Sequence, residues 1–465
     1  MKNEARSIFA ANPLVIITVL VCWFSAFSAR AVAQGTQGQN AVYSGSSCCV
    51  GTSAFIDAST FAGNVTNPNF CSVLNYVLLN KVPTVGGVID ARGLPGTTGT
   101  SMTCSASPWA GISSSPPATI LLPTGTIVIP TPWALPPSTR LIGQGDNLSS
   151  GSIIQACTST TCTSSFSGSA MIQIGSSGCV SSGCIGISAE NLILDGQGQS
   201  SGGSYIGGIA NPNSTQSYID HVSLYQILGT GLSVYSNASG SGPYTNINFD
   251  TGSKSPVSTT VCVSINGLTG TRGVRGLKCT AESNDPQAAV LLDSPNNFIK
   301  DVTVVGFYDG IRVGANAPAQ SNVLFNVIGD TSNVCYPTCP TPVRAIHISS
   351  NGSPNVADLS IIGVGNDAPS GTFTIWDDLT GAQISDPFVG MYALGKAANN
   401  GYARFTTSPS VVTWAAGTSS PSGNCAQGSL YSCTGGTTGS SNCGQTPYAL
   451  WGCPMIPGGV WKGIR

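Results

Sequence analysis

Charged residues are scarce in this sequence: Asp, Glu, Lys and Arg make up 8% of its 465 residues, against roughly 25% in typical globular domains. The 17 basic and 19 acidic residues give a formal net charge of −2, and the basic residues form no cluster. Nucleic-acid binding needs a concentrated positive field, so this composition argues against a nucleic-acid partner. The hydrophobic content of 41% argues against a disordered chain.

Helical periodicity and long apolar runs are also rare. Only residues 70–81 show an apolar helical face, formed by Cys71, Leu74, Val77 and Leu78. Beyond residue 33, no apolar stretch approaches the roughly 20 residues of a membrane-spanning helix. The rest of the chain is predicted to form short β-strands.

The N-terminus has the pattern of a secretory signal peptide. Lys2 and Arg6 precede an apolar run from residue 14 to 27, and small residues at 31–33 form a cleavage site. We expect cleavage after Ala33 and a mature protein that is secreted or lies on the cell-envelope exterior, with no membrane partner. The alternative, an uncleaved anchor, is disfavoured because the apolar run is short.

The chain has 17 cysteines, and removal of Cys22 with the signal peptide leaves an even number. An even count in an exported chain predicts disulfide bonds. Close spacing suggests the pairs Cys157–Cys162, Cys179–Cys184 and Cys335–Cys339, and a C-terminal group of Cys425, Cys433, Cys443 and Cys453. Since the chain has only two histidines, no metal-ligand set is predicted, and the cofactor requirement, calcium included, stays open.

The most informative pattern is an internal repeat. Seven segments align at spacings of 30, 25, 30, 25, 25 and 32 residues, beginning at Asn191, His221, Asn246, Gly276, Asp301, Asn326 and Asp358. The first position suits a bend, and the apolar residues after it alternate as in a strand. A further strand is expected at 231–234, 261–264, 310–313, 345–348 and 371–375.

Three short strands per turn of 25 to 30 residues predict an all-β fold, a parallel β-helix whose turns stack to bury their apolar faces. A β-sandwich is the structural alternative, although it explains the shared register less well. The expected organisation is a signal peptide at 1–33, an N-terminal cap at 34–117, the β-helix at 118–380 and a Gly/Ser/Cys-rich C-terminal cap at 381–465.

At these residues the chain resembles the pectin-lyase-like right-handed β-helix superfamily, and most of all its pectate lyase superfamily proteins. The resemblance covers roughly residues 85–380. Besides the repeats, it rests on Gly86-Gly-Val-Ile-Asp-Ala-Arg-Gly93, Leu122-Pro-Thr-Gly125, Leu141-Ile-Gly-Gln-Gly145 and Leu194-Asp-Gly196. It implies a single-stranded right-handed helix, a groove along one strand face and activity on acidic polysaccharides.

The catalytic signatures of two branches of this superfamily are incomplete here. The Asn-Thr-Asp, Asp-Asp and Gly-His-Gly series of polygalacturonase-like hydrolases is missing. Tyr218-Ile-Asp-His221 is similar to the Trp-Ile-Asp-His signature of extracellular pectate lyases, but the Arg-x-Pro-x-x-Arg element is missing. The resemblance therefore implies the architecture more strongly than a reaction.

Only side chains that point out of a β-helix can meet a ligand. On the third strand, alternation places Arg312, His347 and Thr374 in one outward column, and adjacent turns would bring Arg312 and His347 about 4.8 Å apart. Asp309, Tyr308, Trp376 and Asp378 would border this column. We expect His347, Arg312 and Asp309 to be catalytic, and Trp376, Tyr308 and Asp378 to bind substrate. The alternative is an ordinary polar surface around an exposed histidine.

A second candidate pair is Asp195 and Asp250, which share the position after the second strand of each turn. Two rungs separate them, roughly 9.6 Å, near the upper limit for the two carboxylates of an inverting glycosidase. Local hydrogen bonds in turns explain such aspartates equally well.

These observations predict an exported carbohydrate-active protein that cleaves an acidic or plant-type polysaccharide by hydrolysis or β-elimination. The alternative is a non-catalytic surface β-helix that binds glycan or serves as an adhesive or structural module. Either way the expected partner is a polysaccharide or glycan, and the oligomeric state stays open.

Overall fold

The structure is a computed structural model, and it describes residues 54–96, 101–112, 115–175, 184–235, 237–238, 240–266, 271–281, 288–330, 343–349, 356–366, 372–386, 388–396, 402–407, 414–417, 430–433, 450–452 and 462–464. Several predicted features lie outside these residues, namely the signal peptide, Cys179 of the Cys179–Cys184 pair, the Cys335–Cys339 pair and most of the C-terminal cysteine group.

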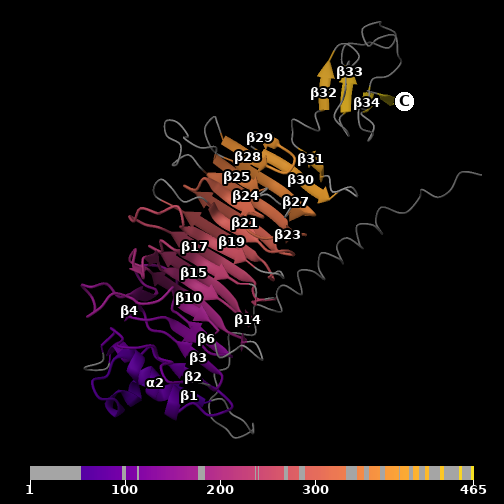
Figure 1. The fold of residues 1–465 in the computed structure, drawn as a ribbon. Coiled ribbons are helices and arrows are strands. Elements are labelled where there is room, and N and C mark those ends of the chain that lie inside the picture. Colours follow the sequence, from indigo (N-terminus) through magenta and orange to yellow (C-terminus); the bar gives the residue numbers. More distant parts are fainter. Residues whose placement is uncertain are drawn as a thin grey trace, which may run out of the picture. The chain divides into compact units, whose positions relative to one another are not determined.

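Two large sheets dominate the described residues (Figure 1). The first sheet consists of β1 (Ala54–Asp57), β2 (Gly87–Asp90), β3 (Ala118–Leu121), β4 (Gly125–Ile129), β6 (Thr139–Ile142), β7 (Ser152–Ala156), β10 (Ser188–Asp195), β15 (Tyr218–Tyr225), β17 (Tyr244–Asp250), β19 (Val274–Thr280), β21 (Phe298–Val305), β24 (Val323–Asp330), β27 (Leu359–Asn366), β30 (Phe388–Lys396) and β31 (Tyr402–Thr407). The second sheet consists of β5 (Trp133–Leu135), β8 (Ala170–Ile174), β13 (Gly207–Asn211), β16 (Thr230–Val234), β18 (Val261–Asn266), β20 (Ala288–Asp293), β22 (Asp309–Val313), β25 (Val343–Ile348), β28 (Thr372–Asp377) and β29 (Ala382–Ile384).

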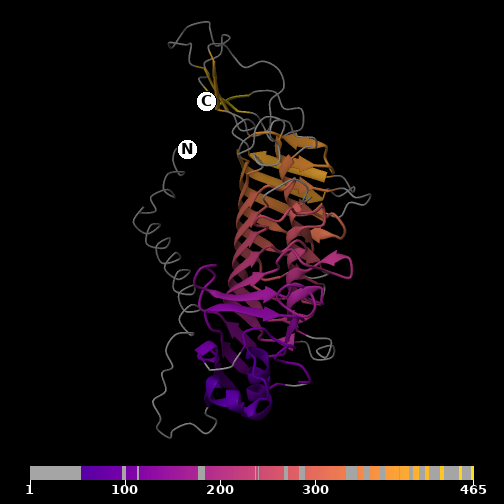
Figure 2. The same cartoon turned by 90° about the vertical axis from the view of Figure 1, so that its left-hand side faces the viewer.

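From β15 to β22 the chain alternates strictly between the two sheets, so that each turn adds one parallel strand to each (Figure 2). The mostly β content and the stacked parallel strands predicted from the repeat are confirmed. Parallel order ends where β30 pairs with β27, and β29 with β28, in antiparallel fashion. The first sheet already begins with β1 and β2, inside the segment assigned to the N-terminal cap.

Several smaller sheets and two short helices accompany these two sheets. Three two-stranded sheets pair β9 (Cys184–Ile185) with β14 (Ser214–Thr215), β11 (Ser200–Ser201) with β12 (Ser204–Tyr205), and β23 (Ala319–Gln320) with β26 (Val356–Ala357). A separate sheet contains β32 (Trp414–Gly417), β33 (Leu430–Cys433), β34 (Leu450–Gly452) and β35 (Lys462–Ile464). Two 3-10 helices, η1 (Ala58–Asn64) and η2 (Leu94–Gly96), lie near the N-terminal strands in sequence.

The predicted helix is present as α2 (Phe70–Asn80). It begins at a capping box, in which the Asn69 side chain accepts from the Ser72 backbone and Ser72 accepts from the Asn69 backbone. Its buried face contains Cys71, Leu74 and Val77, as the periodicity predicts. None of the described helices is long and apolar enough to cross a membrane.

Stacked side chains from successive turns form the core. Val222, Ile247, Leu277, Val302 and Val327 pair rung by rung in the first sheet, and each is almost fully buried. No single turn could bury its own apolar face, so this stacking removes the apolar surface from water.

The bend residues occupy the left-handed region of the backbone. All seven predicted positions have a positive φ, from 51° at His221 to 63° at Gly276. Six of them are in register, but the seventh row is wrong, because Asn326 faces Gly363 rather than Asp358. The spacing from Asn326 to Gly363 is longer than the other spacings, and alignment on Asp358-Leu-Ser-Ile361 displaced the row by five positions.

Asn246→Val at a bend is expected to lower the free energy of unfolding by about 1–2 kcal/mol, because a β-branched residue fits the left-handed region poorly. Asn246 has a φ of 54° and donates from Nδ2 to Asp220 Oδ1 at 2.9 Å. Chemical denaturation would measure the change. Asn248→Val, two residues along the same strand and also exposed, is the matched control and should change stability by less than about 0.5 kcal/mol. Equal effects at both positions would contradict this account.

Three disulfide bonds lie within the described residues. Cys157–Cys162 is confirmed, whereas Cys71–Cys104 and Cys262–Cys279 were not predicted. Proximity in sequence could not find the last two, because their cysteines are 33 and 17 residues apart and meet through the fold. Cys184 is also disulfide-bonded. Disulfides of this number fit an oxidising compartment.

Replacing both Cys262 and Cys279 by alanine is expected to destabilise the protein by about 3 kcal/mol. The disulfide lowers the conformational entropy of the unfolded chain, and this effect grows with the number of residues between the cysteines, here 17. Urea unfolding of the double variant would show this as a lower midpoint. The matched control replaces Cys157 and Cys162 by alanine. The disulfide that it removes joins cysteines only 5 residues apart, so the loss of stability should be about 2 kcal/mol. A larger loss in the control would refute the loop-length argument.

Candidate functional site

The second sheet presents two outward columns at its C-terminal end. In one, Asp309 of β22 pairs with Arg344 of β25. In the other, Arg312 of β22 pairs with His347 of β25, which pairs with Trp376 of β28. The predicted adjacency of Arg312 and His347 is therefore present on neighbouring strands.

Thr374 does not belong to this column, contrary to the prediction. Ile346 pairs with Ile375, so Trp376 takes the outward place beside His347. Thr374 is buried instead. The alternation was counted from Phe373 as an inward residue, but Phe373 is only half-buried and pairs with Arg344.

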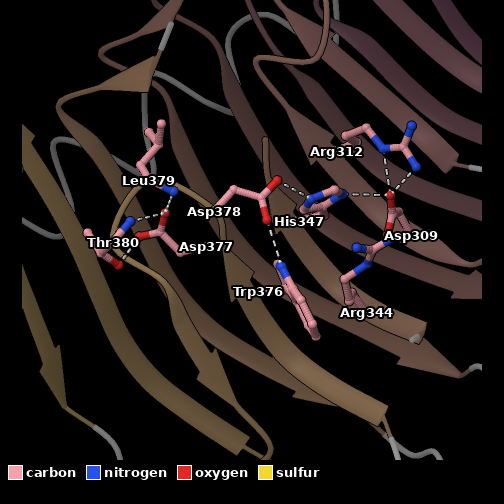
Figure 3. A network of polar contacts seen from close by, with 9 residues as sticks. All are labelled: Asp309, Arg312, Arg344, His347, Trp376, Asp377, Asp378, Leu379 and Thr380. Carbon is pink, nitrogen blue, oxygen red and sulfur yellow. Dashed lines mark hydrogen bonds and ion pairs between the residues drawn. The ribbon is translucent and has the colours of Figure 1, made fainter. Parts of the chain in front are cut away.

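Asp309 is the centre of the cluster, and it is fully buried by the side chains around it (Figure 3). Arg312 Nε donates to Asp309 Oδ2 at 2.6 Å, and Arg344 Nε donates to Oδ1 at 2.6 Å. His347 Nδ1 lies 3.0 Å from Oδ2. One carboxylate thus holds two guanidinium groups and an imidazole.

Burial alone would raise the pKa of Asp309. The hydrogen bond with His347 and the positive charges of Arg312 and Arg344 outweigh burial, and together they hold this pKa below its ordinary value. Asp309 is therefore a carboxylate at neutral pH, and its burial prevents direct contact with a large ligand.

His347 bridges two carboxylates. Its Nδ1 faces Asp309, and its Nε2 lies 3.0 Å from Asp378 Oδ2. The imidazolium form can donate to both oxygens, whereas the neutral form can donate to only one. Figure 3 shows the imidazole between the two carboxylates. This arrangement can hold a proton and pass it to or from Asp378, whose side chain is 31% exposed.

Trp376 forms the aromatic border of the site. Its Nε1 donates to Asp378 Oδ1 at 2.7 Å, and the Phe373 ring meets it edge-on at 4.8 Å. The Arg344 guanidinium lies 5.6 Å from the centroid of the indole. Tyr308 contributes little surface, since it is only 9% exposed.

Arg344 is the residue of this cluster that the sequence did not reveal. The predicted strand starts at Ala345, whereas β25 begins at Val343 and includes Arg344. Strict alternation from Ile346 and Ile348 would place Arg344 on the inward side, so no pattern in the sequence put it beside Asp309. Its guanidinium supplies half of the arginine charge around Asp309.

Asp195 and Asp250 lie on the first sheet, apart from this cluster. Asp195 pairs with Tyr225 and Tyr225 with Asp250, so the two aspartates are two rungs apart as predicted. Asp195 accepts from Gln155 Nε2 at 3.0 Å and from the Gln197 backbone at 3.1 Å. Asp250 accepts from the Gly252 backbone at 2.8 Å. The structure does not bring all five predicted catalytic residues into one site.

No group of three histidine, cysteine or acidic side chains suited to a metal ion occurs among the described residues. The second histidine, His221, occupies a bend of the first sheet with a φ of 51°, and its Nδ1 lies 3.0 Å from Asp220 Oδ2. His221 is therefore a bend residue, in the same column as Asn191 and Asn246.

No protein-family model and no curated protein matches this sequence. Similar solved structures include the A-module of mannuronan C-5 epimerase AlgE4 from Azotobacter vinelandii (12% identity, 57% of this chain and 84% of that one, TM-score 0.29). Others are ORF18 of Geobacillus virus E2 (10%, 88% and 86%, TM-score 0.34) and the DFA-IIIase of Arthrobacter chlorophenolicus A6 without its lid (12%, 70% and 94%, TM-score 0.26). At these values the likenesses assign neither family nor activity.

Proposed function

We propose that the protein is an exported, right-handed, three-segment β-helix that binds an acidic polysaccharide on the outer face of the second sheet and cleaves it at His347. The observation that carries the proposal is the chain of contacts Asp309–His347–Asp378 beside Trp376. A carboxylate that orients a histidine, next to an accessible acid and an aromatic ring, is a combination suited to acid–base chemistry on a sugar.

Each side chain has a role in this proposal. Asp309 positions His347 through Nδ1, and His347 with Asp378 moves the proton that hydrolysis or β-elimination requires. The guanidinium N–H groups of Arg312 and Arg344 that Asp309 leaves unused would bind a uronate carboxylate. The Trp376 ring would stack on a sugar face.

The alternative function is glycan binding without catalysis, and one observation favours it. Both nitrogens of His347 already have carboxylate partners, and Asp309 is shielded from solvent. A cluster satisfied in this way could serve only to hold the last parallel rungs together.

A panel of acidic and neutral polysaccharides would decide between the two functions. Wild-type protein is assayed for new reducing ends, which report any chain cleavage, and for the ultraviolet absorbance of unsaturated products, which reports β-elimination. We expect cleavage of an acidic substrate that is lost in His347→Ala. Binding of acidic polymers without products would establish the alternative function, and activity that survives in His347→Ala would refute the site assignment.

A further inference from the structure

A hollow lies on the same face of the second sheet as the Asp309 cluster, on strands nearer the N-terminus. It is a cavity of about 500 Å³ whose floor includes Gly207 and Ala210 of β13 and Thr230 and Ser233 of β16. Tyr205, in β12, and Tyr235, directly after β16, line it from two separate segments. The volume is in the range of small-molecule sites.

The chemistry of the lining points to an uncharged, hydroxyl-rich ligand. Tyr205 and Tyr235 are 38% and 51% exposed, so both rings present faces to solvent. Among the described residues that line the cavity, none is charged, five carry aliphatic hydroxyl groups and five are glycine or alanine. Aromatic faces with neutral hydrogen-bonding groups suit the apolar faces and hydroxyls of a sugar ring, whereas an anion would find no cation here.

Register connects this cavity to the Asp309 cluster. Ser233 pairs with Ser264, which pairs with Leu291, Arg312 and His347 in turn. These four steps separate Ser233 from His347 by roughly 19 Å along the sheet.

In the two columns that contain Ser233 and Thr230, the described residues of the intervening rungs carry no charged side chain. On these rungs the outward positions hold Ser264 and Leu291 in one column, and Val261 and Ala288 in the other. Asp293 of β20, two residues beyond Leu291, is buried and accepts from the backbone and side chain of Asn316. A polymer could therefore run along a neutral strip from the tyrosines to the arginines.

We propose that the Tyr205/Tyr235 cavity is a subsite for uncharged sugar units, and that the ligand is a heteropolysaccharide with neutral units beside acidic ones. The acidic part of this inference rests on the proposed function of the Asp309 cluster. The neutral subsite stands on its own lining.

Calorimetric titration with defined oligosaccharides tests the subsite. The probes are cellohexaose, xylohexaose, mannohexaose and galactohexaose as neutral chains, and hexagalacturonate as the acidic one. We expect the wild type to bind at least one neutral probe, and Tyr205→Ala with Tyr235→Ala to bind it about tenfold or more weakly. Tyr205→Phe with Tyr235→Phe should retain most of the affinity, because the rings remain. Phe55→Ala, at an exposed aromatic residue of β1, is the matched control and should bind like the wild type.

The outcomes separate the two proposals. Failure of every neutral probe to bind wild type, or equal binding by the double alanine variant, would overturn the subsite. If hexagalacturonate neither binds nor is cleaved while tyrosine-dependent neutral binding persists, the proposed function and the heteropolysaccharide fail, but the neutral subsite stands.

Discussion

Asp309→Asn is expected to lower the free energy of unfolding by about 3 kcal/mol, the lower end of the range for breaking a buried ion pair. The amide would leave Arg312, Arg344 and His347 close together without their shared carboxylate. Since the Arg312 side chain is 21% exposed, water can partly solvate its charge in the variant. The loss of stability should therefore stay below the upper limit of that range. Urea unfolding at pH 7 measures the change.

The pH dependence of this effect follows from the lowered pKa of Asp309. The folded protein binds the proton less tightly than the unfolded chain, whose Asp pKa is near 3.8, so this contribution to stability is complete above that value. It is lost as pH falls further through the folded-state pKa. The difference between wild type and Asp309→Asn should therefore shrink with acidification below about pH 4.

Asp301→Asn is the matched control for the same chemical change. Asp301 is an exposed bend residue 3.6 Å from Lys300, and asparagine occupies the same column at Asn246 and Asn326. An exposed pair of this kind contributes about 0–1 kcal/mol. If Asp309→Asn proved as mild as Asp301→Asn, or if its effect did not change with pH, the central role of Asp309 would be wrong.

His347→Asn is expected to reduce kcat on the acidic substrate by about 100-fold or more, with a smaller change in KM, because loss of an acid–base group typically costs 10²–10⁴. Asparagine can still accept or donate one hydrogen bond, but it cannot take up a proton and pass it to or from Asp378. Initial rates over a range of substrate concentrations separate kcat from KM.

His221→Asn provides the control, since it changes the only other histidine in a bend position that tolerates asparagine. It should retain full activity and nearly full stability. Loss of activity in both variants would indicate a folding effect, which circular dichroism and the unfolding midpoint would reveal. Full activity in a folded His347→Asn would rule out acid–base catalysis at this position.

Much of the fold could be predicted because every turn of stacked parallel strands needs the same kinds of residue at the same positions. Each turn needs a residue that tolerates a left-handed bend and apolar residues at fixed offsets after it, and Asn246, Gly276 and Leu277 meet both needs in the sequence. Where a long spacer interrupted the repeat, counting failed, and Gly363 rather than Asp358 took the bend. The bridge between Cys262 and Cys279 was equally invisible, because proximity in sequence does not reveal which cysteines face each other across turns.

The sequence by itself determined the class of fold and the neighbours Arg312 and His347, because strand alternation and turn length set which side chains share a face. Only the tertiary structure decided that Asp309 is buried beneath two arginines, that Trp376 rather than Thr374 adjoins His347, and that two tyrosines 30 residues apart line one cavity. Those facts depend on strand register and side-chain packing in three dimensions, which no local pattern of residues encodes.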